Sequence, residues 1–254
     1  MDEQPSLMAT AIPPSSSSLA SRLMNIFVAP GEVFDELKAG PPKAANWVVP
    51  LVLAMIVGVV YTIVIFSQPG ILQKIKEANE KKFQQMVDQG KMTQKQADET
   101  VAKVEQFMTP LFFKLTGSFG ALVMNAAFLF LIATILWLLG RFFFKSEMTY
   151  AQALQANGLS TMIYMLGVIV AMLLAVIYGN TAMTPGPVLL ISHFDEADKL
   201  HWILSALNVF TLWYLAVLAV ALTKLSGASF LKAALWLYGL WAFFTFGSIF
   251  VFHH

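Results

Sequence analysis

Trp47 to Phe66 reads WVVPLVLAMIVGVVYTIVIF, a run of 20 residues without a charged side chain. A helix needs about 20 mostly apolar residues to cross the hydrocarbon core of a bilayer. Pro50 falls in the first turn, where its missing N–H costs a helix little. The stretch therefore predicts a transmembrane helix that begins near Trp47.

The composition of the whole chain is that of a membrane protein. Of its 254 residues, 57% are hydrophobic and 12% are charged, whereas a soluble domain has about 25% charged residues. The mean hydropathy is +0.68. A net charge of +1 gives no reason to expect a nucleic acid as partner. The chain has no cysteine, which excludes disulfides, thiol catalysis and cysteine-ligated metal.

Four further apolar runs follow the first one. They cover residues 115–140, 158–178, 202–223 and 233–252. Together with residues 47–66 they predict an all-α polytopic membrane protein, a bundle of five transmembrane helices over residues 47–254. An odd number of spans puts the two ends of the chain on opposite sides of the membrane.

The distribution of basic residues favours a cytoplasmic N-terminus. Seven bases precede the first span or follow the second and fourth: Arg22, Lys38, Lys43, Arg141, Lys145, Lys224 and Lys232. The short loop between spans three and four holds only Lys199. This asymmetry agrees with the positive-inside rule. The long loop after the first span, with eight lysines against six acids, opposes it, so the predicted orientation rests on the short connections.

Two segments precede the first span. Residues 1–20 are rich in serine and proline and predict a disordered tail. Residues 21–46 predict an amphipathic, interfacial segment with a short helix that starts at Pro30 and ends at Gly40. The apolar residues of this helix share one face: Val33, Phe34 and Leu37. Because its polar face carries acids, we expect it to pack on the cytoplasmic end of the bundle rather than on anionic lipid.

Residues 69–110 predict an external helical hairpin between the first two spans. The segment is rich in residues that favour helices. Gly90 fits a helix C-terminus, and Thr93 with Gln96 forms a capping box that starts the second helix, to about Met108. The hairpin is either a solvated cap over the bundle or a docking surface for a protein partner.

No catalytic residue, cofactor or metal site is predicted. The sequence has no HExxH, GxSxG or phosphate-loop motif, and the spans have no acidic residue for a proton relay. One stretch between spans three and four holds side chains of the metal-binding type: His193, Asp195, Glu196, Asp198 and His201. Their spacing matches no established site. Ser192 and Asp195 could instead cap the helix that leads into span four.

Two patterns inside the spans concern helix packing. Span three has a small residue at every fourth position: Gly167, Ala171, Ala175 and Gly179. Such a stripe lets two helix backbones approach closely, either within this chain or across a homodimer. Three asparagines in or near the spans need hydrogen-bond partners if they are buried in lipid: Asn125, Asn157 and Asn208. They either join helices to one another or line a polar groove.

Two segments resemble the Yip (Ypt-interacting protein) family, in particular its bacterial members. Residues 22–51, RLMNIFVAPGEVFDELKAGPPKAANWVVPL, are similar to the family's entry motif, a Phe-containing helix and a first span punctuated by prolines. The matching positions are Pro30, Phe34, Pro41 and Pro50. Residues 207–241 are similar to the family's ending, with Trp213 in the fourth span and Lys232 at the start of the fifth.

The resemblance implies five helices, a cytoplasmic N-terminus and no enzymatic activity. The chain lacks the DLYGP-type motif of the eukaryotic branch, so binding of Rab-type GTPases is not carried over. We therefore expect a non-enzymatic protein of the bacterial inner membrane with an external C-terminus. It would act as a scaffold or adaptor through partners bound at the N-terminal helix and the hairpin. The alternative is transport or lipid handling, as a permease subunit or a scramblase-like bundle.

Overall fold

The chain folds into a bundle of long helices. The computed structural model describes residues 17–107 and 109–252, and this part of the chain contains ten α-helices and no strand, which confirms the all-α prediction. Five of the helices are long and apolar enough to cross a membrane. They are α3 (Ala45–Ile65), α6 (Pro110–Leu138) with its π-helical continuation η1 (Leu139–Phe143), α7 (Tyr150–Tyr178), α9 (Val209–Ser226) and α10 (Phe230–Phe252).

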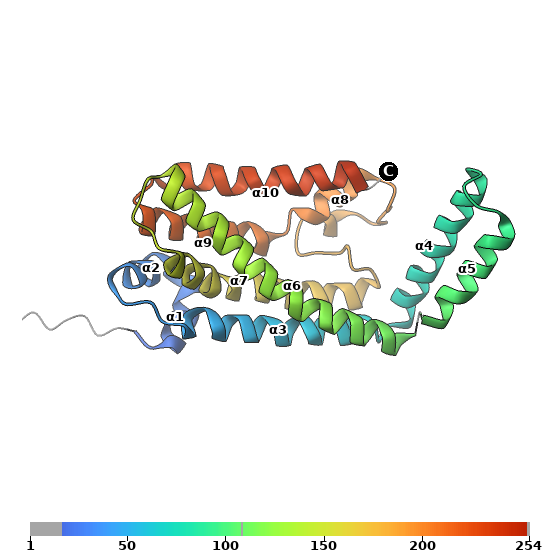
Figure 1. Cartoon of the computed structure of the whole chain (residues 1–254), viewed down its shortest axis with the longest axis horizontal. Helices are drawn as coiled ribbons and strands as arrows, with labels where there is room; N and C mark the ends of the chain where they lie inside the picture. The colour runs from blue at the N-terminus through green and yellow to red at the C-terminus, as the bar shows by residue number, and fades with distance from the viewer. Residues whose placement is uncertain (1–16, 108, 253–254) are drawn as a thin grey trace, which may run out of the picture.

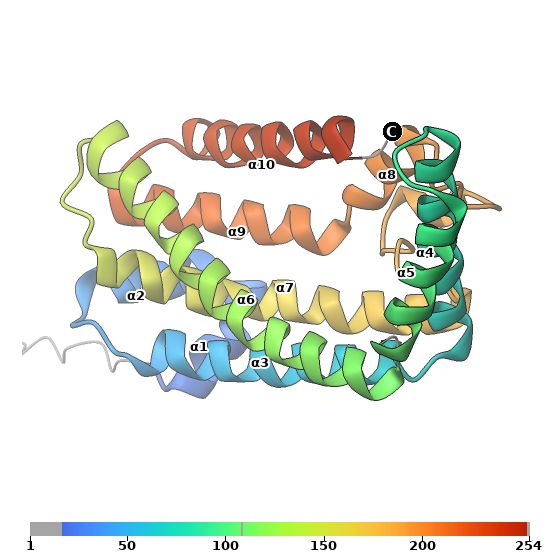
Figure 2. The ribbon, with the colours of Figure 1, turned by 45° about the vertical axis from the view of Figure 1, so that its right-hand side comes forward.

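Helix α7 lies at the centre of the bundle. It packs against α3, α6 and α9, whereas α10 packs against α9 and the short helix α8 (Lys199–Ala206). Figure 2 shows α6 crossing the bundle obliquely, from the side of α3 at one end toward α9 and α10 at the other. The largest cluster of buried apolar residues joins α7 and α9 to the N-terminal helices. The core therefore lies mainly at one end of the bundle.

Two short helices, α1 (Leu19–Val28) and α2 (Pro30–Ala39), cover that end. Helix α1 begins inside the predicted tail, because the hydroxyl of Ser18 accepts a hydrogen bond from the Ser21 N–H and caps the helix. Of the tail predicted over residues 1–20, residues 1–16 lie outside the described residues. Helix α2 begins at Pro30, and Gly40 is its C-cap, as predicted from the sequence.

Helices α4 (Pro69–Asp88) and α5 (Gln94–Phe107) form the predicted hairpin at the opposite end of the bundle (Figure 1). Gly90 takes a positive φ of 67° in the turn. The backbone N–H of Thr93 donates to the Gln96 side chain and that of Gln96 donates to the Thr93 hydroxyl, which confirms the capping box. Met108 lies outside the described residues. The base of the hairpin contacts the bundle through Ile71, which packs with Ile65 and Ala175.

The fourth span is shorter than predicted. Residues 202–223 do not form one helix, because α8 ends at Ala206 and α9 begins at Val209. Asn208 separates the two: its side chain accepts a hydrogen bond from the Phe210 N–H, 2.9 Å away, and so caps α9. The Val209 N–H donates to the carbonyl of Pro185 instead of continuing α8. The side chain of an asparagine can accept a hydrogen bond from a nearby backbone N–H in place of a helical carbonyl, and here this interrupts an otherwise apolar helix.

Two other spans are longer than predicted. Helix α6 starts at Pro110, where Thr109 caps it, and α7 starts at Tyr150. A capping box between Thr149 and Gln152 fixes the start of α7. The segment before Gly158, predicted to lie outside the span, therefore belongs to the same continuous helix.

Candidate functional site

The α1–α2 end of the bundle holds three of the seven buried polar side chains in the described part of the chain, those of Arg22, Asn46 and Gln155. Apolar contacts fix the position of α2 there. Val33, Phe34 and Leu37 are buried in the main core, together with Ile26 of α1. The apolar face of α2 thus packs on α9 and α7, as expected from its spacing.

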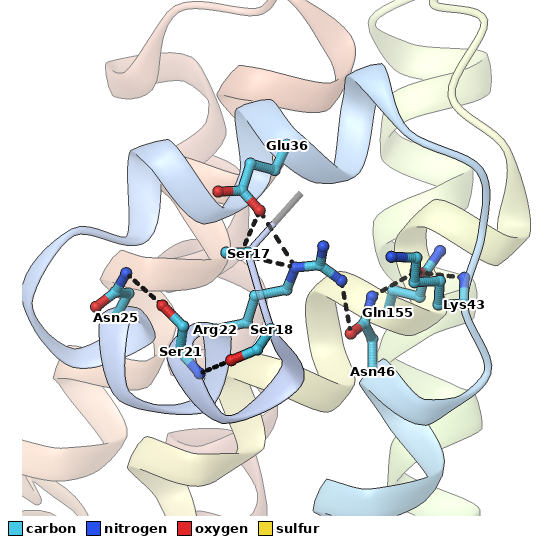
Figure 3. Close-up of polar contacts among 9 residues, drawn as sticks. All are labelled: Ser17, Ser18, Ser21, Arg22, Asn25, Glu36, Lys43, Asn46 and Gln155. Carbon is cyan, nitrogen blue, oxygen red and sulfur yellow. Dashed lines mark hydrogen bonds and ion pairs between the residues drawn. The ribbon is translucent and has the colours of Figure 1, made fainter. Parts of the chain in front are cut away.

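A buried arginine joins four helices at this end (Figure 3). Arg22 is only 5% exposed. Its Nε donates to Ser17 Oγ at 3.1 Å and to Glu36 Oε2 at 3.3 Å, and its Nη1 donates to Asn46 Oδ1 at 3.3 Å. Asn46 Nδ2 donates in turn to Gln155 Oε1 at 2.8 Å. The series connects α1 and α2 to the starts of α3 and α7.

Each end of this polar series is satisfied by further hydrogen bonds. Gln155 Oε1 also accepts from the backbone N–H of Lys43, and Gln155 Nε2 donates to the carbonyl of Ala151. At the other end, the Ser17 hydroxyl donates to Glu36. That hydrogen bond and the Arg22 guanidinium hold the pKa of Glu36 below its ordinary value, against the opposite effect of partial burial. Glu36 therefore stays ionised beside Arg22.

A second polar link ties α2 to the end of α9. Lys224 Nζ lies 2.5 Å from Asp35 Oδ2, and Lys38 Nζ donates to the carbonyl of Lys224 at 2.8 Å. The Lys224 and Asp35 side chains are 38% and 54% exposed. An ion pair at this exposure contributes at most about 1 kcal/mol. This link therefore orients α2, while the apolar face supplies most of the stabilisation.

Sequence reasoning did not predict the roles of Arg22, Asn46 and Gln155. In the sequence, Arg22 is one of seven bases that favour a cytoplasmic N-terminus, and no pattern distinguishes Asn46 or Gln155. Their one signal in the sequence is a polar side chain on the buried face of an amphipathic or apolar helix. Such a residue needs a partner, but the spacing does not say which one.

Most of the residues that match the Yip pattern lie at the ends of helices or pack in the core. Pro30 is the first residue of α2. Pro50 is buried inside α3, in its second turn and not in the first as predicted, because the helix begins at Ala45. Pro41 directly follows the C-cap of α2. Trp213 of α9 packs edge-on against Phe27 of α1, with 5.9 Å between ring centroids. The other two differ in exposure: Phe34 is fully buried, whereas Lys232 is exposed in the first turn of α10.

The small residues of α7 contact other helices of the same chain. A Cβ added to Gly167 would lie 2.5 Å from the Cβ of Phe210 in α9. Ala175 packs against Ile65 and Ile71, and Ala171 is half-buried. Gly179 has a φ of 59° and ends the helix, and its carbonyl accepts from Lys74. A homodimer through α7 stays a prediction.

The three asparagines make separate contacts. Asn157 is buried; its Nδ2 donates to the Leu129 carbonyl at 2.9 Å, and its Oδ1 accepts from Tyr214 at 2.6 Å, so it joins α6, α7 and α9. Asn125 donates to the Ala121 carbonyl of its own helix, and Asn208 caps α9. Among the described residues, no hydrogen bond joins one of these asparagines to another.

The stretch with metal-binding side chains folds into a capped loop. Asp198 caps α8 by accepting from the Leu200 N–H, so the predicted caps, Ser192 and Asp195, do not hold that position. The Nδ1 of His201 accepts instead from the backbone N–H of Asp195. Within residues 17–107 and 109–252, no group of three or more His, Cys, Asp or Glu side chains could hold a metal ion.

Comparison with models of known protein families shows to which family the chain belongs. The Yip1 domain matches residues 24–251, from α1 to the end of α10. The chain belongs to the Yip1 family. This family is linked to membrane trafficking, and its members are generally non-enzymatic membrane proteins. No curated protein and no solved structure matches the chain. The Yip1 domain thus includes both the α1–α2 end and the hairpin, and the resemblance to the Yip family is confirmed.

Proposed function

We propose that this Yip1-domain protein is a scaffold or adaptor of the bacterial inner membrane, without catalytic activity. Helices α1 and α2 would face the cytoplasm, and the C-terminus and the α4–α5 hairpin the outside. Protein partners would bind at the hairpin and at the exposed face of α2. The distribution of bases in the short loops supports this orientation.

The hairpin is the observation that carries the proposal. It lies beyond the end of the spans and contacts the rest of the protein at its base (Figures 1 and 2). Ile71 and Ala97 of the hairpin are buried, whereas other apolar side chains, such as those of Phe83 and Val101, are only half-buried. A charged helical pair that neither crosses the bilayer nor covers the core has the exposure needed to bind another protein.

Site-specific photocrosslinking in native membranes tests the proposal. A photoreactive residue at Gln85 or Lys95 in the hairpin, or at Glu32 in α2, is expected to capture a defined protein. The same residue at Phe243, on the exposed face of α10, is the matched control and is expected to capture lipid. If the hairpin and α2 positions capture no protein in cells that produce the full chain at its native level, the scaffold function is wrong.

The transport alternative receives less support from the contacts. A polar groove needs side chains with free hydrogen-bonding groups along a path, but Asn157 uses its amide nitrogen and oxygen on Leu129 and Tyr214. Flux or lipid-flip assays on proteoliposomes separate the two functions. Activity that is lost in both Asn125→Leu and Asn157→Leu variants of a normally folded protein would favour transport.

A further inference from the structure

We propose that the junction of η1 and the first turn of α10 binds the headgroup of an anionic phospholipid. The site consists of two exposed lysines, Lys145 and Lys232, beside an aromatic group formed by Phe142, Phe143 and Trp236. It does not depend on the scaffold function proposed above. It requires only that the five long helices cross a bilayer.

Ring contacts bring the two segments of this site together. The ring centroids of Phe143 and Trp236 lie 4.2 Å apart. Lys232 precedes Trp236 by one helical turn, about 6 Å along the axis. Lys145 follows Phe143 by two residues, at most about 7 Å of chain. The two lysines therefore lie close along the chain to the same aromatic pair, although they are far apart from each other in the sequence.

The site lies where two spans meet the membrane boundary. The apolar span that contains α6 ends at Phe143, and the last span begins at Phe230. Phe142 and Phe143 are 63% and 57% exposed, and Trp236 is 38% exposed. Aromatic side chains favour the level of the lipid headgroups, where an apolar ring meets a polar surface. Acyl chains would cover these rings while the lysines reach the phosphates.

The turn after η1 is fixed by hydrogen bonds that hold Lys145 in an unusual conformation. The Phe144 N–H donates to Leu139 O, and both the N–H and the hydroxyl of Ser146 contact Gly140 O. Lys145 has a φ of 52°, in the left-handed region that glycine adopts at lower cost. A lysine in this place costs backbone strain. Binding of an anionic headgroup would explain why a lysine, and not a glycine, occupies this position.

Charge pairing leaves the two lysines available. Arg141, on the same turn, has its Nη1 2.8 Å from Glu147 Oε2, and Lys224 pairs with Asp35. In the described residues, neither Lys145 nor Lys232 forms an ion pair. Two uncompensated ammonium groups beside exposed rings match a lipid that has a net negative headgroup. A zwitterionic lipid has no net charge, so its headgroup would be attracted less strongly to the two lysines.

Trp236 is one of six tryptophans in the chain, and comparison with the W236F variant isolates its share of the fluorescence. The full chain is reconstituted in phosphatidylcholine vesicles that contain increasing fractions of brominated phosphatidylglycerol or, in parallel, brominated phosphatidylcholine, and tryptophan quenching is measured. In the unmodified protein we expect brominated phosphatidylglycerol to quench the tryptophan fluorescence at a lower mole fraction than brominated phosphatidylcholine does. K145Q/K232Q is expected to raise that fraction about fivefold per lysine removed. W236F is expected to remove the component that prefers phosphatidylglycerol.

Two control variants make the result specific. K81Q/K82Q removes the same charge from the exposed face of α4 and is expected to keep the lipid preference. K145R/K232R keeps both charges and is expected to keep it too. Equal quenching of the unmodified protein by both lipids overturns the site. So does an equal loss of preference in K81Q/K82Q and K145Q/K232Q, or a loss in K145R/K232R at unchanged melting temperature.

Discussion

At the scale of single residues, Gly158 determines how closely α3 and α7 approach. A Cβ added there would lie 2.5 Å from the Trp47 Cα and 2.8 Å from the Asn46 carbonyl oxygen, so backbone atoms would have to move. We expect Gly158→Ala to lower the free energy of unfolding by about 1–3 kcal/mol. Thermal melting of the purified protein in detergent measures this loss.

Gly120 of α6 provides the control for that substitution, because nothing lies within 4 Å of an added Cβ. Alanine favours a helix over glycine by about 1 kcal/mol. Gly120→Ala should therefore leave the melting temperature unchanged or raise it. Equal melting temperatures of the two variants would mean that α3 and α7 do not approach as the structure shows.

The Glu36 carboxylate makes the α1–α2 end sensitive to acid. The folded protein lowers the pKa of Glu36 below the ordinary value of 4.5. A depressed pKa stabilises the folded state above the unfolded-state value, and this stabilisation is lost as the pH falls below about 4.5 through the folded-state pKa. We expect the melting temperature of the unmodified protein to fall over this range.

Glu36→Gln should weaken that acid dependence, because the glutamine has no proton to take up. Glu32→Gln removes a carboxylate from the same helix without a contact to Ser17 or Arg22 and is the matched control. Melting curves from pH 6 to pH 3 compare the three proteins. The same loss between these pH values in all three would assign the acid sensitivity to other groups.

The polar contacts of this end show what a sequence leaves open at the residue scale. The spacing of Val33, Phe34 and Leu37 was enough to predict their burial, because apolar periodicity is a local property of a helix. The link from Arg22 through Asn46 to Gln155 is not local. It depends on how α1, α3 and α7 cross, so no pattern within one segment could indicate it.

At the scale of elements, apolar burial should hold α2 more strongly than its charges do. Phe34→Ala is expected to cost about 3–5 kcal/mol, as for other fully buried aromatic residues. Lys224→Gln removes only the exposed pair with Asp35 and should cost at most about 1 kcal/mol. Trypsin cleavage after Lys43, between α2 and α3, reports the release of α2.

We expect cleavage after Lys43 to be much faster in the Phe34→Ala variant and nearly unchanged in the Lys224→Gln variant. Faster cleavage in the lysine variant alone would show that the ion pair, not the core, keeps α2 in place. Phe27→Leu is a milder change in the neighbouring helix and should fall between the two.

The ends of the helices were predictable where their caps are local. Thr93 and Gln96 formed the expected capping box, and Thr149 with Gln152 has the same pattern. The second box fixes the start of α7 before Gly158 and could have been read from the sequence. The break at Asn208 was harder to predict, because hydropathy alone counts one asparagine as a minor interruption. Its capping hydrogen bond and the carbonyl of Pro185 decide the geometry.

At the scale of the whole molecule, the five spans followed from hydropathy, but their arrangement did not. Apolar runs such as those of α7 and α10 look alike in composition. In the bundle, α7 is central and contacts α3, α6 and α9, whereas α10 lies at the side against α9 and α8. Close approach at Gly158 and Gly167 and the hydrogen bonds of Asn157 distinguish α7. These are contacts between helices, which a single-sequence pattern does not contain.

The two ends of the bundle give a test of orientation, since the chain has no native cysteine to label. Ser229 lies exposed in the turn between α9 and α10, near the α1–α2 end, and Gln85 lies exposed in the hairpin at the other end. With α1 and α2 in the cytoplasm, an impermeant maleimide added to intact spheroplasts should label Gln85→Cys, and Ser229→Cys only after lysis. The unmodified chain supplies the background. The reverse pattern would keep the bundle and overturn the cytoplasmic placement of α1, whereas labelling of both positions in intact spheroplasts would contradict the placement of the two ends across one bilayer.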